Sequence, residues 1–161
     1  MMNLDLDVTD LAILAELQSN AAQTNLQLAE RVHTSPPTCL RRTKRLHDLG
    51  LIDRQVALLR PERLAQALGH GLTAVVEITL DRQDAQALDA FEGRIVQDRV
   101  VQQCYRVSPG PDCVLMIHVR DMPGYLAASE RLFSSDANVR NVKAFFSVKR
   151  AKFDPSLPLG V

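Results

Sequence analysis

SPPTCLRRTKRLHDLGLI, residues 35–52, contains the start and stop signals of one complete helix. Ser35 is a favoured N-cap residue, and Pro36 suits the first helical position because the amide hydrogen that proline lacks has no partner there. Gly50 readily adopts the left-handed conformation that commonly ends a helix. The stretch therefore predicts a helix over roughly residues 36–49.

This helix is expected to have one packing face and one cationic face. The residues that share the packing face at helical spacing are Cys39, Thr43, Leu46 and Leu49 or Gly50. The outer face carries, one to two turns apart, Arg41, Lys44, Arg45 and Asp48. Arg42 falls at the edge of the packing face, so a structural role or a phosphate contact is as much expected for it as contact with a base.

Two shorter helices are predicted before it. Asp7 and Asp10 resemble a capping box, and leucines then recur at helical spacing over about residues 7–18. Thr24 and Gln27 form a second capping box, followed by a helix of about two turns. A short helix, a tight turn and a longer helix with a basic face are typical of a helix-turn-helix, whose last helix enters the major groove of DNA.

Charge is segregated along the chain although nineteen basic and nineteen acidic residues cancel. Residues 1–30 contain five acids and no lysine or arginine, whereas residues 31–60 contain seven bases and two acids. A basic helix face is more often a solvated surface, but this one follows two capped helices inside the segregated region. Any electrostatic footprint for DNA is therefore expected on residues 31–60.

The remainder of the chain predicts a second domain after a linker. An extended segment and a short helix are expected over residues 54–71. Alternation and helical spacing then predict, in order, a strand at 72–80, a helix at 85–95, a strand at 100–107, a strand at 113–119, a helix at 122–132 and a strand at 142–148. This β-α-β-β-α-β order is the ferredoxin-like arrangement, with both helices on one face of an antiparallel sheet.

The strand at 113–119, CVLMIHV, is apolar on both faces, which predicts a central strand. The sheet face without helices then needs cover, most simply from the same face of a second copy. Cys104 and Cys113 are expected to be small core or interface residues, with a redox role as the less favoured alternative. No CxxC pair or cluster of histidines indicates a zinc site or a disulfide framework. No apolar run is long enough to span a membrane, so the cytoplasm is the expected location.

The whole chain resembles the Lrp/AsnC family of bacterial and archaeal regulators. The resemblance is carried by residues 35–52, by the opening LDVTDLAILAELQSNA at 6–21 and by the ending SLPL at 156–159. It implies a winged-helix-like DNA-binding head, a ferredoxin-like effector domain, assembly into dimers and then tetramers or octamers, and regulation by an amino acid. DNA contact is expected from Ser35, Pro37, Thr38, Arg41, Arg42, Lys44 and Arg45. The first three lie at the helix N-terminus, where amides and hydroxyls bind phosphate, and the alternative role for them is capping.

The family carries a Gly-x-x-Asp-Tyr-like turn between its second and third strands, where relatives bind an amino acid between subunits. Here Asp112 matches, but Gly110 is displaced by one position and Cys113 replaces the aromatic residue. The effector site is therefore expected at Ser108, Gly110 and Asp112, with no other cofactor and no metal. The alternative for Asp112 is that its carboxylate only fixes the turn by accepting backbone amides.

These features predict an α+β protein with a helix-turn-helix domain at 1–53, a linker at 54–71 and an effector-binding and oligomerisation domain at 72–161. The expected function is that of a non-enzymatic, sequence-specific regulator that acts on the nucleoid. Two alternatives remain: an enzyme of the same architecture resembling sirohaem decarboxylases, and a ligand-binding module that acts on partner proteins. The cationic outer face of the helix at 36–49 favours the regulator, since no constellation of nucleophile and base stands out.

Overall fold

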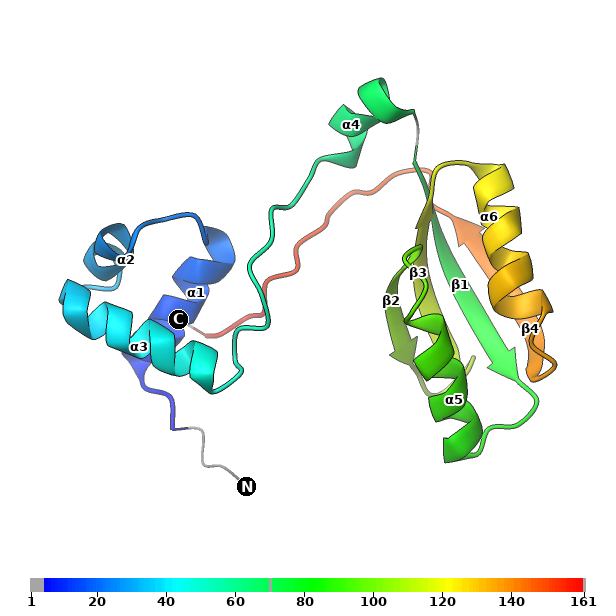
Figure 1. The fold of residues 1–161 in the computed structure, drawn as a ribbon, viewed down its shortest axis with the longest axis horizontal. Helices are drawn as coiled ribbons and strands as arrows, with labels where there is room; N and C mark the ends of the chain where they lie inside the picture. Colours follow the sequence, from blue (N-terminus) through cyan, green and yellow to red (C-terminus); the bar gives the residue numbers. More distant parts are fainter. Residues whose placement is uncertain (1–4, 70, 161) are drawn as a thin grey trace. The chain divides into compact units, whose positions relative to one another are not determined.

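The computed structural model describes residues 5–69 and 71–160, which form two compact units (Figure 1). The first unit comprises Met1–Leu58 together with Lys152–Val161, and the second comprises Leu59–Ala151. The chain therefore passes through the second unit and returns to the first.

The first unit is a three-helix head built from α1 (Val8–Ser19), α2 (Asn25–Arg31) and α3 (Pro36–Asp48). Both predicted capping boxes are confirmed: the side chains of Asp7 and Thr24 accept the amides of Asp10 and Gln27, and both reciprocal bonds are present. The small core of the head consists of Ile13, Leu28, Ala29, Cys39 and Leu46. These residues come from all three helices, so the head is held together by their shared apolar faces.

Schellman motifs end both α2 and α3. The amide of Thr34 donates to the carbonyl of Ala29 at 2.9 Å, and His33 between them has a positive φ of 52°. At the end of α3, Gly50 has a φ of 71° and supplies the predicted stop. A histidine thus occupies, in the turn between α2 and α3, a backbone conformation that favours glycine.

The second unit is a helix-covered antiparallel sheet. Its elements are α4 (Pro61–Leu68), β1 (Leu72–Leu80), α5 (Ala85–Ile95), β2 (Val101–Arg106), β3 (Cys113–Val119), α6 (Met122–Ser129), the π-helical turn η1 (Glu130–Ser134) and β4 (Val139–Phe146). The strands lie in the order β2-β3-β1-β4, and every pair is antiparallel. The predicted ferredoxin-like order is confirmed, with β3 central beside β1.

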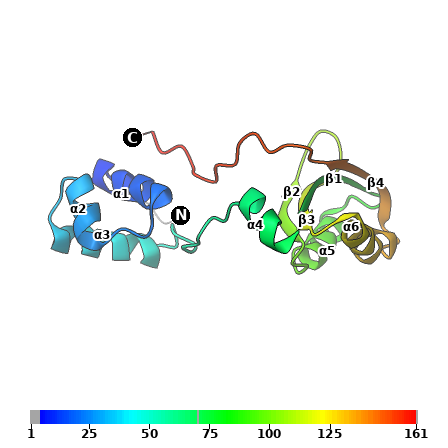
Figure 2. The ribbon, with the colours of Figure 1, turned by 90° about the horizontal axis from the view of Figure 1, so that it is seen from above.

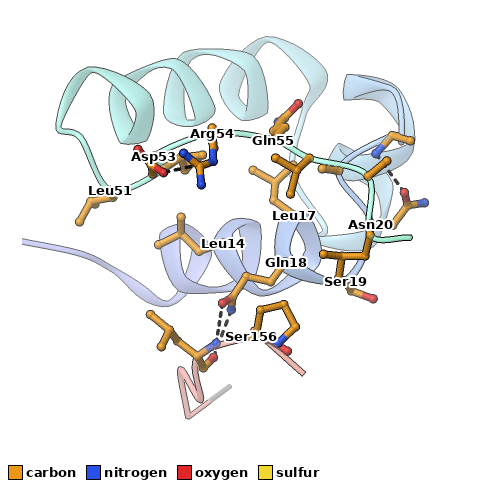
Figure 3. Close-up of a pocket in the computed structure, with 18 of the residues that line it drawn as sticks. Leu14, Leu17, Gln18, Ser19, Asn20, Leu51, Asp53, Arg54, Gln55 and Ser156 are labelled. Carbon is orange, nitrogen blue, oxygen red and sulfur yellow. Dashed lines mark hydrogen bonds and ion pairs between the residues drawn. The ribbon is translucent and has the colours of Figure 1, made fainter. Parts of the chain in front are cut away.

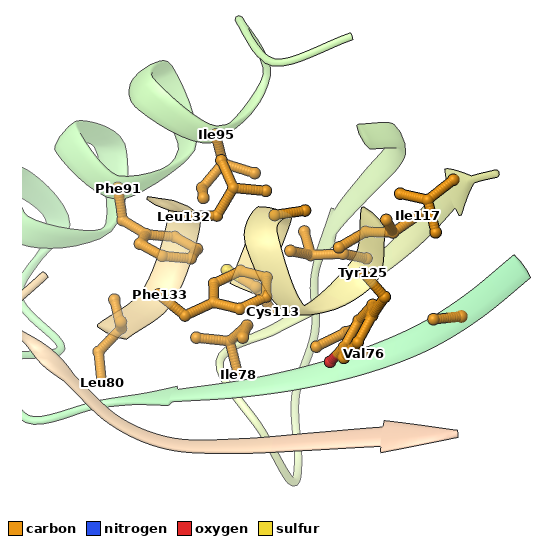
Figure 4. Packing of buried hydrophobic residues seen from close by; sticks show 14 residues of the cluster. Val76, Ile78, Leu80, Phe91, Ile95, Cys113, Ile117, Tyr125, Leu132 and Phe133 are labelled. Atoms are coloured by element: carbon orange, nitrogen blue, oxygen red, sulfur yellow. The ribbon is translucent and has the colours of Figure 1, made fainter. Parts of the chain in front are cut away.

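Both long helices cover the same face of this sheet (Figure 2). Alternate residues of β1 and β3, among them Val76, Ile78 and Ile117, are fully buried against Phe91 of α5 and Phe133 of η1 (Figure 4). The opposite sheet face is not covered by any described helix of the second unit. The core therefore lies on one side of the sheet only.

Some predicted boundaries are wrong. The last strand begins three residues earlier than expected, because Val139 pairs with Leu80 beyond an irregularity in the register. It ends at Phe146, and Val148 is fully exposed. Residues 51–60 are extended but pair with no strand in the described part of the chain.

Candidate nucleic-acid interface and effector turn

The α2–α3 pair is held in a fixed arrangement. Asn25, at the first position of α2, donates from Nδ2 to the carbonyl of Pro36 at 2.9 Å and so joins the N-termini of the two helices. The buried side chains of Cys39 and Leu46 hold the inner face of α3 against the head. This rigid support leaves the outer face of α3 as the surface offered to a partner.

That outer face carries four exposed residues on one stripe, namely Pro37, Leu40, Arg41 and Lys44. Arg41 and Lys44 have no ion-pair partner within residues 5–69 and 71–160. Leu40 is 60% exposed, although leucine is a residue of cores. Leu40 was not predicted as a DNA-contacting residue, although an apolar residue one turn from Pro37 and next to Arg41 on the polar face is a signal for such a role.

Two of the predicted DNA-contacting cations are engaged within the protein. Arg42 Nη1 donates to Asp7 Oδ2 at 2.7 Å and to Asp10 Oδ1 at 3.0 Å, and Arg45 donates to the other oxygen of Asp10. The carboxylate of Asp10 is buried, whereas the side chains of Arg42 and Arg45 are 23% and 42% exposed. Arg42 therefore has the structural role that was the alternative to a base contact. Arg45 binds Asp10, but part of its side chain remains exposed to solvent.

These contacts explain two pKa shifts. The amide of Asp10 and then the guanidinium of Arg42 lower the pKa of Asp7 below its ordinary value, because both stabilise the ionised carboxylate. The same ion pairs raise the pKa of Arg42. The N-terminus of α1 is thus fastened to the middle of α3 by charge.

The N-terminus of α3 differs from the expectation. Ser35 occupies the N-cap position, but its hydroxyl donates to Thr38 Oγ1 at 2.9 Å and makes no side-chain cap bond. Pro36 and Pro37 fill the first two helical positions, so they remove the backbone donors there. Of the first three residues of α3, only Thr38 offers an amide to a phosphate, and the hydroxyls of Ser35 and Thr38 are the other polar groups at this end.

The turn between β2 and β3 places Asp112 against the end of β1. Asp112 Oδ2 accepts the amide of Leu80 at 2.7 Å and Gln83 Nε2 at 3.2 Å, while the Asp112 amide donates to the carbonyl of Ile78 at 2.8 Å. Asp112 therefore fixes the turn, as the alternative interpretation expected. Its Oδ1 atom has no hydrogen-bond partner among the described residues. Ser108 and Gly110 are exposed in the same turn.

The uncovered sheet face carries apolar residues from all four strands, beside the charged residues Glu77 of β1 and Lys143 of β4. Val75 of β1 lies between Met116 of β3 and Phe145 of β4, and Val114 of β3 lies beside Tyr105 of β2. Tyr105 and Phe145 are 54% and 46% exposed. Within the second unit, this face is therefore partly exposed to solvent.

The cysteines lie in the core rather than in a reactive site. Cys113 is fully buried, and burial raises the pKa of its thiol to about 12. Burial also raises the pKa of Cys104. Within the described ranges, no three His, Cys, Asp or Glu side chains are placed to hold a metal ion. None of the described helices has the length and hydropathy needed to cross a membrane.

A groove of about 840 Å³ lies in the first unit, between the end of α1, the extended residues 51–58 and the returning C-terminal segment (Figure 3). Gln18 closes one side of it. Its Nε2 donates to the carbonyl of Leu157 at 3.1 Å, and its Oε1 accepts the amide of Leu157 at 2.7 Å. The side-chain amide thus pairs with Leu157 as a neighbouring strand would.

Two family models match the chain. One, described as winged helix-turn-helix DNA-binding, matches residues 6–53, and the other, described as the Lrp/AsnC ligand binding domain, matches residues 73–157. An uncharacterised HTH-type transcriptional regulator of Sinorhizobium fredii is 31% identical over 158 residues, covering 98% of this chain and 91% of that protein. The leucine-responsive regulatory protein of Rhizobium meliloti is 32% identical over 152 residues, covering 94% and 95%.

Solved structures resemble the chain over almost its full length. The transcriptional regulator of Neisseria meningitidis in complex with L-Met has a TM-score of 0.82 and 34% identity, with 97% of this chain and 98% of that chain covered. An AsnC family transcriptional regulator from Agrobacterium tumefaciens has a TM-score of 0.85 and 28% identity, with 96% and 97% covered.

Proposed function

Since this chain belongs to the Lrp/AsnC family of DNA-binding transcriptional regulators, we propose that it reads its operator with the outer face of α3. The exposed stripe of Pro37, Leu40, Arg41 and Lys44, on a helix fixed to α2, carries this proposal. A helix of this kind enters the major groove with its N-terminal part against the base edges.

Each residue of the stripe suits a different contact. Arg41 is free to pair with the two acceptors of a guanine, and Leu40 provides an apolar surface for a thymine methyl group. Lys44, one turn further on, suits a phosphate. Ser35 and Thr38 offer hydroxyls at the helix start. Arg42 and Arg45 orient α3 through Asp10, and the exposed part of Arg45 remains available to the DNA backbone.

Selection from a randomised duplex library, followed by fluorescence anisotropy, tests this proposal. Arg41→Ala is expected to weaken binding to the selected site by about 1–3 kcal/mol, roughly 5- to 150-fold, and to relax the preference at one base pair. Arg99→Ala, which removes an exposed cation from the second unit, is the matched control. Equal affinities of the two variants for the selected site would remove Arg41 from the interface.

We also propose that two copies associate through the uncovered sheet face, and that dimers assemble further into tetramers or octamers. The central position of Val75 between Met116 and Phe145 supports this, because an apolar sheet face gains from removal from water. Val75→Lys is expected to yield monomers by light scattering, whereas Gln97→Lys, which adds the same charge at an exposed site, leaves assembly unchanged. A Val75→Lys variant that still assembles as the wild type would contradict the proposed interface.

The effector is proposed to be an amino acid bound at the turn of Ser108, Gly110 and Asp112 and completed by a second copy. Asp112 Oδ1 is the acceptor for its ammonium group, since Oδ2 is taken by Leu80 and Gln83. Asp112→Asn keeps an oxygen for the Leu80 amide but removes the charge, so amino-acid binding is expected to fall at least tenfold while the fold is kept. Calorimetry with the twenty amino acids, beginning with L-methionine because the Neisseria relative binds it, tests this. Equal binding by wild type and variant would exclude Asp112.

A regulator of transcription acts where the chromosome is. We therefore place this protein on the nucleoid in the cytoplasm and assign it no catalytic activity. Loss of DNA binding without loss of amino-acid binding in Arg41→Ala is the pattern expected of a regulator and of neither alternative.

A further inference from the structure

Positive charge is concentrated in the two segments that connect the units. Residues 54–60 contain Arg54 and Arg60, and residues 147–152 contain Lys149, Arg150 and Lys152, with no acid in either segment. By contrast, residues 1–53 hold five bases and seven acids, and residues 72–146 hold eight bases and ten acids. Both of these ranges thus carry a small net negative charge. The net positive charge that balances them in this neutral chain lies in the two connecting segments.

The cations of these segments are open to solvent. The side chains of Arg54 and Lys152 are 77% and 81% exposed, and their ion pairs with Asp53 and Asp154 are long, at 3.7 and 3.8 Å. Exposed pairs of this kind contribute little and are easily exchanged for another anion. Arg60 and Lys149 are exposed as well. Four of the cations therefore remain available to an external polyanion, namely Arg54, Arg60, Lys149 and Lys152.

Two of these cations belong to the first unit, which carries α3. Arg54 lies in the extended residues 51–58, and Lys152 begins the segment Lys152–Val161 that returns to this unit. Other residues of that returning segment line the same groove of the first unit as Arg54 (Figure 3). We call Arg54 and Lys152 the basic connector.

The short chain between α3 and Arg54 keeps the basic connector near DNA when α3 lies in the major groove. Arg54 follows the last residue of α3 by six positions, and an extended chain covers at most about 3.6 Å per residue, so Arg54 stays within about 20 Å of the end of α3. Duplex DNA presents one phosphate charge for about every 1.7 Å of its axis. Phosphates that flank the recognised base pairs therefore lie within range of Arg54, and Lys152 belongs to the same unit.

We infer that the basic connector forms a second, sequence-independent contact with the phosphate backbone of DNA flanking the operator. The inference rests on the proposed function, because it presupposes that α3 binds DNA. A different role for these cations is to keep the exposed apolar residues Val56, Leu58 and Val148 from associating with other extended chains. That role predicts no effect on DNA affinity.

The double variant Arg54→Gln/Lys152→Gln tests the inference against Arg99→Gln/Arg140→Gln, which removes the same charge from exposed positions of the second unit. Anisotropy is measured on a selected operator and on a scrambled duplex over a range of KCl concentrations. The connector variant is expected to lose about tenfold or more in affinity on both duplexes at 0.15 M salt, with a log–log salt slope shallower by up to about 1.8. The control is expected to keep the wild-type affinity and slope.

Three outcomes would overturn or redirect the inference. A connector variant that matches the control in slope and affinity excludes the contact, and so does a loss confined to the operator with an unchanged slope. Wild-type protein that binds neither duplex refutes the proposed function instead. Arg54→Gln alone serves as a second variant if light scattering shows that the first alters assembly, and a smaller loss with a slope shallower by up to about 0.9 is expected of it.

Discussion

Arg42 on α3 donates a hydrogen bond of 3.0 Å to the buried carboxylate of Asp10 on α1. Asp10 also receives Arg45, so one buried carboxylate fixes two guanidinium groups of the helix that carries the candidate DNA-reading face. The orientation of α3 therefore depends on a residue 32 positions earlier in the chain.

Asp10→Asn is expected to lower the free energy of unfolding by about 2 kcal/mol. Removing one partner of a buried pair costs roughly 3–5 kcal/mol, and the partial exposure of both arginines reduces that figure here. Urea unfolding provides the measurement. Asp53→Asn, at an 86%-exposed carboxylate, is the control, and identical midpoints for the two variants would contradict the assigned role of Asp10.

His33→Gly is expected to stabilise the first unit by about 0.5–1 kcal/mol, because glycine adopts a positive φ without the steric penalty of a side chain. The reverse test uses the end of α3. Gly50→Ala meets no atom within 4 Å of the new Cβ, so its expected destabilisation of about 1 kcal/mol comes from the backbone alone. Thermal unfolding measures the stability of both variants. A loss of stability in His33→Gly would show that the imidazole makes a favourable contact.

Acid is expected to weaken the attachment of α1 to α3. The amide of Asp10 and the guanidinium of Arg42 lower the pKa of Asp7 from its ordinary 3.8, so the stabilisation is present above pH 3.8 and is lost as the pH falls through the lower folded value. Asp7→Asn retains an N-cap but no charge. Its stability deficit relative to wild type should shrink as the pH falls from 5 toward 2, and a deficit that stays constant over this range would contradict the linkage.

Gln18→Ala is expected to release the returning C-terminal segment. Two hydrogen bonds of modest net value are lost at an exposed site, which corresponds to roughly 1 kcal/mol and about fivefold faster hydrogen exchange at the Leu157 amide. Gln97→Ala, in the other unit, should leave this rate unchanged. Exchange at Leu157 that is as fast in wild type as in Gln18→Ala would show that the pairing is not maintained in solution.

Local patterns predicted the elements because each is governed by neighbours in sequence. The capping boxes at Asp7 and Thr24, the glycine stop at Gly50 and the alternation of residues 72–80 all rest on contacts within a few residues. The family, its two kinds of domain and the ferredoxin-like sheet were predicted for the same reason, and because the motif at 35–52 is specific.

Contacts between distant residues could not be predicted in the same way. Helical periodicity placed Arg45 on the outer face of α3 but gave no sign of Asp10, which meets it only after α1 packs across α3. The start of β4 depends on the pairing of Val139 with Leu80, and the partner of Gln18 lies 139 residues away. The DNA-contacting and effector-binding residues stay predictions, because both sites need a partner to complete them.

The return of Lys152–Val161 to the first unit has a consequence for the order in which the protein matures on the ribosome. Domains generally fold as they emerge, beginning with the N-terminal one. Here the head can form its three helices early, but the groove beside Gln18 gains its C-terminal wall only after the sheet unit has been synthesised and the returning segment has emerged. Completion of the DNA-binding unit thus follows synthesis of the sheet unit, and a nascent chain that stalls within the sheet carries a head whose groove lacks this wall.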